Sequence, residues 1–334
     1  MTNIAAHDWH TCRIVEAHLI TERSRRITLE RPRPLGRPAE PGSHVDVRVR
    51  LTDAITDVRS YSVVESDASG RLITITVQRA EHSRGGSAYL HRLEVGDLIE
   101  ATRPLPDFPL LLGADSYTLL AGGIGVTALV ASARALARLG ADYRLVYVGR
   151  RRAAMAYLEL LAAEHGDRLR LHIDDEGTAL EVSDLVREIA AAPGRGELLM
   201  CGPVRLMDEV RRAWAQEGLS PVDLRFETFG NSGWYDAQPF EVSIPELGIT
   251  TTVSTAQTML DALTEAGAEL MWDCRKGECG LCTMAVAGLD GELDHRDVFL
   301  SDSQKQAGDR VCACVTRVVA STTRTPARVT LASV

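Results

Sequence analysis

The sequence predicts a multidomain protein with an antiparallel β-barrel, an α/β domain built on a parallel sheet, and a C-terminal α+β domain. Three observations lead to this prediction. Apolar and polar residues alternate with a period of two in the first third of the chain. Apolar runs then alternate with helical patterns in the middle. Five of the seven cysteines lie in the last quarter, which indicates metal binding rather than disulfides.

Length and composition agree with several folded domains. The chain has 334 residues, and ordinary domains span about 100–200. Hydrophobic residues make up 45% and charged residues 25%, as in globular proteins. The net charge of −9 argues against a nucleic-acid partner, because phosphate binding needs a surplus of Lys and Arg. We find no apolar run of about 18 residues and no signal peptide, so we expect a cytoplasmic protein without a membrane anchor.

The predicted barrel spans residues 1–112. Strand-like segments run from Arg13 to about Asp107, and the alternation is clearest in HVDVRVRL at 44–51 and RLITITVQR at 71–79. Pro, Gly and Asp residues separate these segments, as turns between strands require. Short alternating strands joined by such turns indicate an antiparallel all-β unit, which we expect to close into a barrel.

The parallel-sheet domain is predicted at residues 113–229. At Ser116 the pattern changes to SYTLLAGGIGVTALVASARALARLG, which reads as an apolar run, a glycine turn and a long helix. RLVYVGR at 144–150 and ELLMCGP at 197–203 repeat the apolar run and the turn, and a helical segment follows at 207–218. Strands that alternate with helices indicate a parallel α/β sheet.

A linker is predicted at residues 230–237, where small and polar residues show no periodicity. The C-terminal domain then spans 238–334. It begins with EVSIPELGITTTV at 241–253, whose period of two predicts a hairpin. An amphipathic helix is expected near 255–266, directly before the cysteines.

The cysteine motif DCRKGECGLC predicts an iron–sulfur loop. Cys274, Cys279 and Cys282 have the Cys-x4-Cys-x2-Cys spacing of plant-type 2Fe-2S proteins, whose fourth thiolate comes from far downstream. Gly277 and Gly280 suit a backbone that folds tightly around inorganic sulfide. The alternative is a structural zinc site, which the spacing, the glycines and the missing second Cys-x-x-Cys pair disfavour.

The fourth ligand is either Cys312 or Cys314 in RVCACVTRV, and strand alternation points both side chains the same way. His295 is the only histidine after His172. A Rieske centre needs two histidine ligands and is therefore excluded for this domain. Ligation by thiolates alone implies a low reduction potential.

Two glycine turns of the parallel sheet are candidate nucleotide sites. AGGIGVT at 121–127 follows a strand and opens a helix, where free backbone N–H groups can face a pyrophosphate. CGP at 201–203 ends a later strand of the same sheet, and ligands of open α/β folds bind at the carboxyl ends of strands. The alternatives are a purely geometric turn and, for Cys201, a buried core thiol.

The predicted barrel carries two further motifs. VRSYSVVE supplies Arg59, Tyr61 and Ser62, and SRGGSAYLH supplies the Gly-Gly-Ser at 85–87. Arg offers a fixed fork for phosphate, Tyr a flat face for an aromatic ring, and the glycines bare amides at a helix start. Each motif alone would suit an ordinary strand or turn.

From about residue 12 to 334, the order of these parts closely resembles the phthalate dioxygenase reductase family, which includes vanillate demethylase reductase components. The resemblance implies a flavin-binding barrel, an NAD(P)H-binding α/β domain and a plant-type 2Fe-2S ferredoxin domain of β-grasp fold. FMN is the flavin that it implies, with FAD as the alternative. NADH is the expected nucleotide, with NADPH as the alternative.

The resemblance also assigns residues to these cofactors. It places at the flavin Arg59, Ser60, Tyr61, Ser62, Thr76, Val77, Arg79, Gly85, Gly86 and Ser87. It places at the nucleotide Gly122, Gly123, Ile124, Gly125, Val126, Thr127, Cys201, Gly202 and Pro203. Phe229 in RFETFG matches the aromatic position near the flavin, although a core Phe suits the pattern equally. Ser62 is expected near flavin N5, and Thr127 or Cys201 is expected to orient the nicotinamide.

The same resemblance selects the fourth ligand. Family members typically read Cys-Val-Ser-Arg at the last ligand, and Cys314-Val-Thr-Arg fits this pattern where Cys312-Ala-Cys does not. The metal ligands implied are therefore Cys274, Cys279, Cys282 and Cys314.

By this resemblance the protein is an NAD(P)H-dependent flavin iron–sulfur oxidoreductase that serves a separate oxygenase. Hydride passes to the flavin, and single electrons pass to the cluster and on to a Rieske non-haem iron oxygenase acting on an aromatic or similar small molecule. A haem monooxygenase is the alternative partner. A non-catalytic redox sensor or zinc-stabilised binding module is the alternative from another class. We expect a monomer.

Charge bears on two of these expectations. Residues 238–334 hold 13 Asp and Glu against 8 Lys and Arg, which favours docking to a basic patch on the partner. Arg150, Arg151 and Arg152 follow the second strand of the parallel sheet and could hold a 2′-phosphate, although such a run is usually a solvated face.

Overall fold

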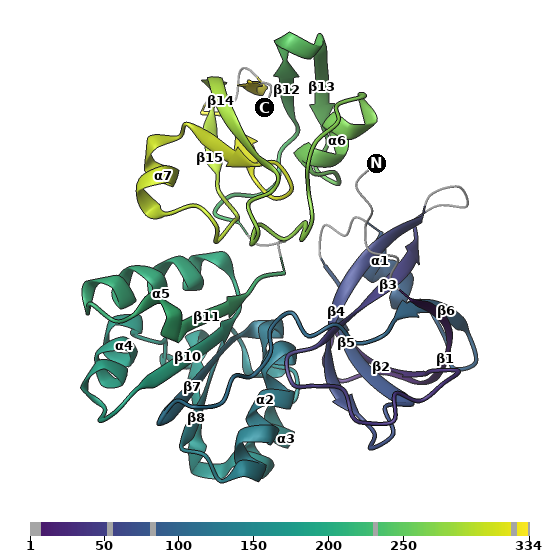
Figure 1. Cartoon of the computed structure of the whole chain (residues 1–334), viewed down its shortest axis with the longest axis vertical. Helices are drawn as coiled ribbons and strands as arrows, with labels where there is room; N and C mark the ends of the chain where they lie inside the picture. Colours follow the sequence, from purple (N-terminus) through teal and green to yellow (C-terminus); the bar gives the residue numbers. More distant parts are fainter. Residues whose placement is uncertain (1–7, 52–55, 81–84, 230–232, 322–325, 333–334) are drawn as a thin grey trace. The chain divides into compact units, whose positions relative to one another are not determined.

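The computed structural model describes residues 8–51, 56–80, 85–229, 233–321 and 326–332 (Figure 1). Its contacts divide the chain into two compact units. The N-terminal unit comprises Ala5–Gly202 and Glu209–Glu227, and the C-terminal unit comprises Pro203–Asp208 and Thr228–Val334. Among the described residues, no helix is long and apolar enough to cross a membrane.

Six antiparallel strands at the start of the N-terminal unit form a closed barrel in the order β1-β2-β5-β4-β3-β6. They are β1 (Trp9–Leu19), β2 (Ser24–Glu30), β3 (His44–Arg50), β4 (Thr56–Ser66), β5 (Leu72–Gln78) and β6 (Leu98–Thr102), with the short helix α1 (Gly86–Leu90) between the last two. Alternate side chains such as Val45, Val47 and Val49 of β3 are buried in the barrel, as the period of two predicts. The prediction of a barrel is confirmed.

The rest of this unit is a five-stranded parallel sheet in the order β11-β10-β7-β8-β9. Its strands are β7 (Ser116–Gly122), β8 (Tyr143–Gly149), β9 (Leu169–Ile173), β10 (Gly196–Cys201) and β11 (Leu224–Glu227). Helices α2 (Val126–Leu139) and α3 (Leu158–His165) lie on one side of it, and α4 (Val182–Ala191) and α5 (Val204–Gln216) on the other (Figure 1). The strand order reverses between β7 and β10, and such a switch point is where open α/β sheets bind ligands.

Short 3-10 turns connect many of these elements. They are η1 (Gly123–Gly125), η2 (Arg152–Ala154), η3 (Gly166–Arg168), η4 (Asp174–Glu176), η5 (Pro221–Asp223) and, in the C-terminal unit, η6 (Pro245–Leu247).

Polar contacts join the barrel to the parallel sheet within the N-terminal unit. Arg134 of α2 forms two hydrogen bonds of 2.8 Å with Glu164 of α3 and lies 3.7 Å from Glu65 of β4. Thr76 of β5 shares a hydrogen bond of 2.5 Å with Tyr157, which directly precedes α3. These contacts hold β4 and β5, which carry much of the predicted flavin site, against the sheet.

The C-terminal unit is a mixed sheet packed against one helix. The five-stranded sheet has the order β13-β12-β18-β14-β16, and β15 and β17 form a separate pair. The strands are β12 (Phe240–Ile244), β13 (Ile249–Val253), β14 (Thr283–Asp290), β15 (Glu292–Asp294), β16 (Arg310–Cys312), β17 (Arg317–Val319) and β18 (Ala327–Leu331), with helices α6 (Met259–Glu265) and α7 (Asp302–Ala307). The predicted hairpin at 241–253 is the antiparallel pair β12 and β13.

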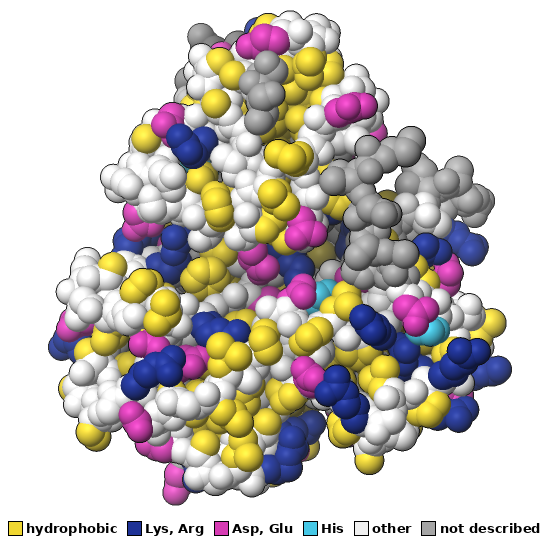
Figure 2. Space-filling model, in the orientation of Figure 1, with side chains coloured by type: hydrophobic (Ala, Val, Ile, Leu, Met, Phe, Trp, Pro, Cys, Tyr) yellow, Lys and Arg dark blue, Asp and Glu magenta, His cyan; other side chains and the backbone are white. Residues whose placement is uncertain are grey.

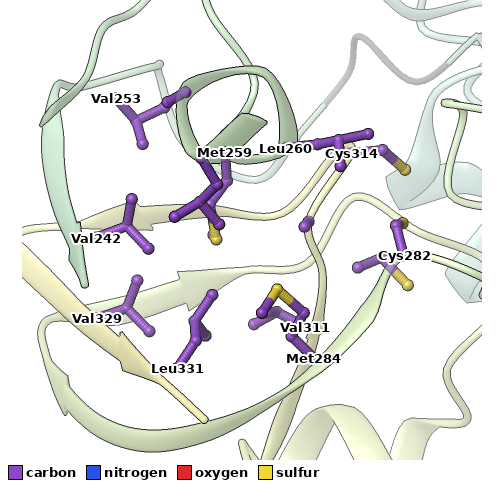
Figure 3. Packing of buried hydrophobic residues seen from close by; sticks show 14 of the residues in the cluster. Val242, Val253, Met259, Leu260, Cys282, Met284, Val311, Cys314, Val329 and Leu331 are labelled. Carbon is purple, nitrogen blue, oxygen red and sulfur yellow. The ribbon is translucent and has the colours of Figure 1, made fainter. Parts of the chain in front are cut away.

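The predicted helix near 255–266 is α6, which is shorter because Thr258 caps its first turn. The Thr258 side chain accepts a hydrogen bond from the Asp261 backbone N–H, and the Asp261 side chain accepts one from the Thr258 N–H. Met259 and Leu260 of α6 pack on the sheet in one apolar cluster that also includes Cys282 and Cys314, and Cys314 lies next to Leu260 (Figure 3).

Candidate functional site

The loop between α6 and β14 brings backbone donors to a cysteine sulfur. The N–H groups of Lys276, Glu278 and Cys279 each donate to Cys274 Sγ at 3.4 Å. A hydrogen bond from Cys314 and then these backbone donors lower the pKa of Cys274. Such donors stabilise a thiolate, which is the form that binds iron.

The two glycines of this loop are required by its shape. Gly277 has a φ of +79° and Gly280 a φ of +74°. A Cβ at Gly280 would lie 2.2 Å from the ring of Phe299, and one at Gly277 would lie 2.8 Å from the Asp297 Cα. Other residues would therefore push the loop away from the segment between β15 and α7 that holds Asp297 and Phe299.

The chain turns at the two candidate fourth ligands. Strand β16 ends at Cys312, and the N–H groups of Val315 and Thr316 both donate to the Cys312 carbonyl, at 3.0 and 2.9 Å. Strand alternation therefore does not extend to Cys314, and the expectation that both side chains point the same way along a strand is wrong.

Side-chain contacts then distinguish these two thiols. Interaction with Cys274 and Cys282 raises the pKa of Cys314, whereas interaction with Cys282 raises the pKa of Cys312, which lies 3.8 Å from Thr283 Oγ1. Cys314 thus meets two of the three loop cysteines, which favours it as the fourth ligand. Cys282 and Cys314 are buried, and Cys274 and Cys279 are partly exposed.

The residues present fit a binuclear cluster. Within the described residues, no three His, Cys, Asp or Glu side chains converge on a point that could hold one metal ion. The assignment therefore rests on the thiol spacing, the inward N–H groups and the glycine loop, which suit four thiolates shared between two irons.

The two predicted glycine turns of the parallel sheet meet at its switch point. A Cβ at Gly125 would lie 2.2 Å from the Cys201 carbonyl oxygen, and one at Gly202 would lie 3.0 Å from the Gly122 Cα. Gly123, with a φ of +55°, faces open space, since a Cβ there would meet no atom within 4 Å. The bare backbone can thus approach a pyrophosphate at the start of α2.

Thr127 stabilises the first of these turns. Its hydroxyl donates to the Ile124 carbonyl at 2.9 Å, and the residue is buried. The sequence prediction gave Thr127 a role in orienting the nicotinamide. In the structure its hydroxyl holds the turn that presents the backbone.

Strand β4 carries a buried hydroxyl to the same edge of the sheet. Ser62 donates to Glu227 Oε2 at 3.4 Å, and Glu227 pairs with Cys201 across β11 and β10. The structure therefore brings Ser62, Gly125 and Cys201 to one place, although they are far apart in the chain. Sequence reasoning missed Glu227; a charged residue at the carboxyl end of a strand at the switch point was the available signal.

The two barrel motifs also lie side by side. A Cβ at Gly86 would lie 3.0 Å from the Arg59 side chain, and Gly85 has a φ of +96°. Arg59 donates to Asp57 at 2.5 Å and to the Val58 carbonyl at 2.8 Å. The Arg59 side chain and the start of α1 thus lie side by side, and the Asp57 carboxylate occupies Nη1 of the guanidinium while its other N–H groups stay available as donors to a phosphate.

The other predicted flavin residues have different surroundings. Ser60 donates to Asp46 at 2.6 Å, and the Val77 side chain is buried in the barrel core. The Arg79 carbonyl accepts two hydrogen bonds from Arg23, at 3.0 and 3.3 Å. Tyr61 is partly buried, and this burial raises the pKa of its hydroxyl.

The last three predicted residues have the following surroundings. Ser87 Oγ accepts a hydrogen bond from the Ala80 N–H at 3.2 Å. Pro203 directly precedes α5, and Phe229 is partly buried after β11.

Comparison with known proteins agrees with this arrangement. The family described as a 2Fe-2S iron-sulfur cluster binding domain matches residues 243–319. Phenoxybenzoate dioxygenase subunit beta of Ectopseudomonas oleovorans is 37% identical over 279 residues, which cover 83% of this chain and 84% of that protein.

Two solved structures cover nearly the whole chain. Phthalate dioxygenase reductase, described as a modular structure for electron transfer from pyridine nucleotides to 2Fe-2S, is 28% identical with a TM-score of 0.72 and 98% of each chain covered. An intact type IV self-sufficient cytochrome P450 monooxygenase is 32% identical with a TM-score of 0.63. That match covers 97% of this chain, which spans 41% of the length of that protein.

A barrel, a parallel sheet with glycine turns at its switch point and a cysteine-rich cluster domain define an iron–sulfur flavin oxidoreductase. The chain belongs to the phthalate dioxygenase reductase-like family, as the match over most of its length to phenoxybenzoate dioxygenase subunit beta shows.

Proposed function

We propose that this protein is the reductase component of a multicomponent oxygenase, which passes electrons from NADH through FMN and a 2Fe-2S cluster to a terminal oxygenase. The observation that carries the proposal is the convergence of Ser62, Gly125 and Cys201 at the switch point of the sheet. When bound, the flavin accepts hydride as an electron pair and releases single electrons.

In this scheme the residues of the chain bind and orient the flavin and the nucleotide. Glu227 accepts the Ser62 hydrogen bond and so fixes the direction of that hydroxyl at the flavin. Gly125 lets the start of α2 pack against Cys201, which places the nucleotide phosphates on backbone N–H groups. Arg59 beside Gly86 supports a single flavin phosphate, as in FMN. No residue is needed as a general acid or base.

An optical spectrum of the purified protein tests the proposal. Flavin bands with a broad iron–sulfur absorbance, both bleached by NADH without oxygen, are expected. A colourless protein would instead support a zinc-stabilised binding module, and a coloured protein that NADH cannot reduce would support a redox sensor. Releasing the flavin and measuring its mass separates FMN from FAD.

NADH is the proposed nucleotide because Arg152 already has an acidic partner. Arg152 donates to both carboxylate oxygens of Glu176 at 2.8 Å, and these residues follow β8 and β9. The pair leaves less positive charge for a 2′-phosphate, and the carboxylate repels one. We expect Glu176→Ala to raise kcat/KM for NADPH about fivefold at most, because the released Arg152 guanidinium can then meet a 2′-phosphate in a solvent-screened position.

Steady-state rates with each nucleotide measure this change. Asp184→Ala is the matched control, because it also releases an arginine from an exposed ion pair, Arg187 on α4. It should leave the nucleotide preference as in the parent protein. An unchanged preference for NADH over NADPH in Glu176→Ala would show that Glu176 does not determine nucleotide choice.

The terminal oxygenase is proposed to be a Rieske non-haem iron enzyme that acts on an aromatic or similar small molecule. The dioxygenase names of the relatives support this choice. A haem monooxygenase is the second candidate, because a similar module occurs within a cytochrome P450 chain. Pull-down from the native host, followed by a spectrum of the captured oxygenase, separates the two.

Docking of this oxygenase is expected to depend on salt. Residues 238–334 carry a net charge of −5, from 13 Asp and Glu and 8 Lys and Arg. Figure 2 shows acidic side chains among apolar and polar ones on the visible face of the C-terminal unit. Electron transfer to the partner should slow severalfold between about 0.05 and 0.5 M salt, because exposed charges are screened. The NADH-dependent reduction of the cluster is the internal control; a partner rate indifferent to salt would contradict the prediction.

We further propose a cytoplasmic monomer with domains at 1–112, 113–229 and 238–334. All seven cysteines are free thiols, which suits a reducing compartment. Light scattering during size exclusion measures the oligomeric state.

A further inference from the structure

Two hydrogen bonds and one further polar contact tie the cluster loop to Thr228, the residue at which the C-terminal unit resumes after β11. The Thr228 N–H donates to Glu278 Oε1 at 2.6 Å. The Thr228 hydroxyl donates to the Lys276 carbonyl at 2.7 Å and lies 3.1 Å from Glu278 Oε1. One residue therefore binds the loop at two positions, both between Cys274 and Cys279.

The groups in this contact are withdrawn from water. Thr228 is only 4% exposed, and Glu278 is partly buried. A carboxylate that leaves water needs donors, and the Thr228 N–H supplies one to Glu278 Oε1. Because the Glu278 N–H also donates to Cys274 Sγ and Glu278 directly precedes Cys279, this residue links Thr228 to two predicted iron ligands.

Thr228 is also the next residue after Glu227. Consecutive Cα atoms lie about 3.8 Å apart across a trans peptide bond. Glu227 accepts the hydrogen bond of Ser62 at the proposed flavin site of the N-terminal unit. A single peptide bond thus separates the residue that holds Ser62 from the residue that holds the cluster loop.

We propose that Glu278 is a positioning residue that fixes the cluster loop to Thr228, and so to the chain at Glu227, for electron transfer from the flavin to the cluster. This inference rests on the proposed function. Glu278 acts here through hydrogen bonds, so the Oε1 acceptor matters and the charge does not.

Stopped-flow mixing of the full, cofactor-loaded protein with NADH in the absence of oxygen tests the proposal. Flavin reduction reports hydride transfer, and the following loss of cluster absorbance reports flavin-to-cluster transfer. Glu278→Ala should slow the second step on the order of tenfold, the expected effect of leaving the buried Thr228 N–H without its acceptor, and leave the first unchanged. Glu278→Gln should retain most of the rate, because its amide oxygen can accept the Thr228 N–H hydrogen bond.

Two further variants complete the design. Thr228→Val keeps the N–H but removes the hydroxyl that bonds the Lys276 carbonyl. It should slow flavin-to-cluster electron transfer about threefold, and it leaves the amino-acid sequence of the cluster loop unchanged. Glu246→Ala on η6 is the control, since it removes an exposed carboxylate from the same unit. Hydrogen exchange provides a readout apart from activity. The Thr228 amide hydrogen should exchange faster in Glu278→Ala than in the parent protein, and its exchange rate should be unchanged in Glu246→Ala.

Several results would overturn the inference. The first is a rate of flavin-to-cluster electron transfer in Glu278→Ala equal to that of the parent protein. The second is an equal loss of this rate in Glu278→Ala and Glu278→Gln, which would assign the effect to the charge of Glu278. If Glu278→Ala does not retain its cluster, Thr228→Val decides instead. A rate of flavin-to-cluster electron transfer in Thr228→Val equal to that of the parent protein would also overturn the inference. A parent protein whose flavin NADH cannot reduce would contradict the proposed function and not this contact.

Discussion

Cys314→Ser is expected to abolish the 2Fe-2S cluster, whereas Cys312→Ala is expected to leave it in place. The two thiols are two residues apart and both are buried, so they make a matched pair. They differ in that the turn after β16 brings Cys314 to both Cys274 and Cys282, whereas Cys312 meets only Cys282 of these two. A cluster bound by three thiolates lacks one iron ligand, and serine is a poor replacement for it.

Iron content, visible absorbance and electron paramagnetic resonance of the reduced protein measure this prediction. Iron in Cys314→Ser should fall from the two atoms of one cluster to nearly none. Reduction of the flavin by NADH should persist, because the proposed flavin and nucleotide residues other than Pro203 and Phe229 belong to the N-terminal unit. A full cluster in Cys314→Ser, together with its loss in Cys312→Ala, would move the fourth ligand to Cys312.

Gly125→Ala is expected to impair the use of NADH more than any other change in the parallel sheet. The added Cβ would lie 2.2 Å from the Cys201 carbonyl oxygen and 2.5 Å from its carbon. Both are backbone atoms at the end of a central strand, so the conflict cannot be relieved by a side-chain rotation. The start of α2 must therefore move away from β10, which displaces the backbone N–H groups proposed to bind the pyrophosphate.

The rate of flavin reduction by NADH should fall on the order of a hundredfold, as misplacement of a bound reactant by about 1 Å can cause. Chemical reduction by dithionite should still bleach both the flavin and the cluster. Gly140→Ala at the end of the same helix is the control. Its φ of +65° makes alanine unfavourable by about 1–2 kcal/mol, but its Cβ would face open space. That variant should lower the melting temperature and leave NADH use unchanged; the reverse pattern would contradict the role of Gly125.

Local sequence patterns were sufficient to predict much of the fold and some of the site residues. The hairpin at 241–253 and the helix after AGGIGVT depend on residue periodicity and on short-range turns. Cys274, Cys279 and Cys282 lie within one loop, so their spacing alone indicates the chemistry. Gly125 and Gly277 could be singled out as glycines in turns, but the backbone atoms that exclude a Cβ there come from distant segments.

Contacts between distant segments could not be predicted in the same way. Glu227 joins Ser62 across 165 positions of sequence, and Thr228 joins Glu278 across 50. Pairing at such separations leaves no periodic signal in a single sequence. Periodicity left the choice between Cys312 and Cys314 open for a related reason, because a period of two assumes that the strand continues, and β16 ends at Cys312.

The sequence by itself determined the order of the three domains, the position of the cluster loop and the two glycine turns, because each depends on residues close together in the chain. Only the tertiary structure decided that Glu227 holds Ser62, that Arg152 is paired with Glu176, and that the turn after β16 brings Cys314 to the loop cysteines. Those contacts arise from the order of strands in a sheet and from the ends of strands, which hydrogen bonding and packing between distant segments establish.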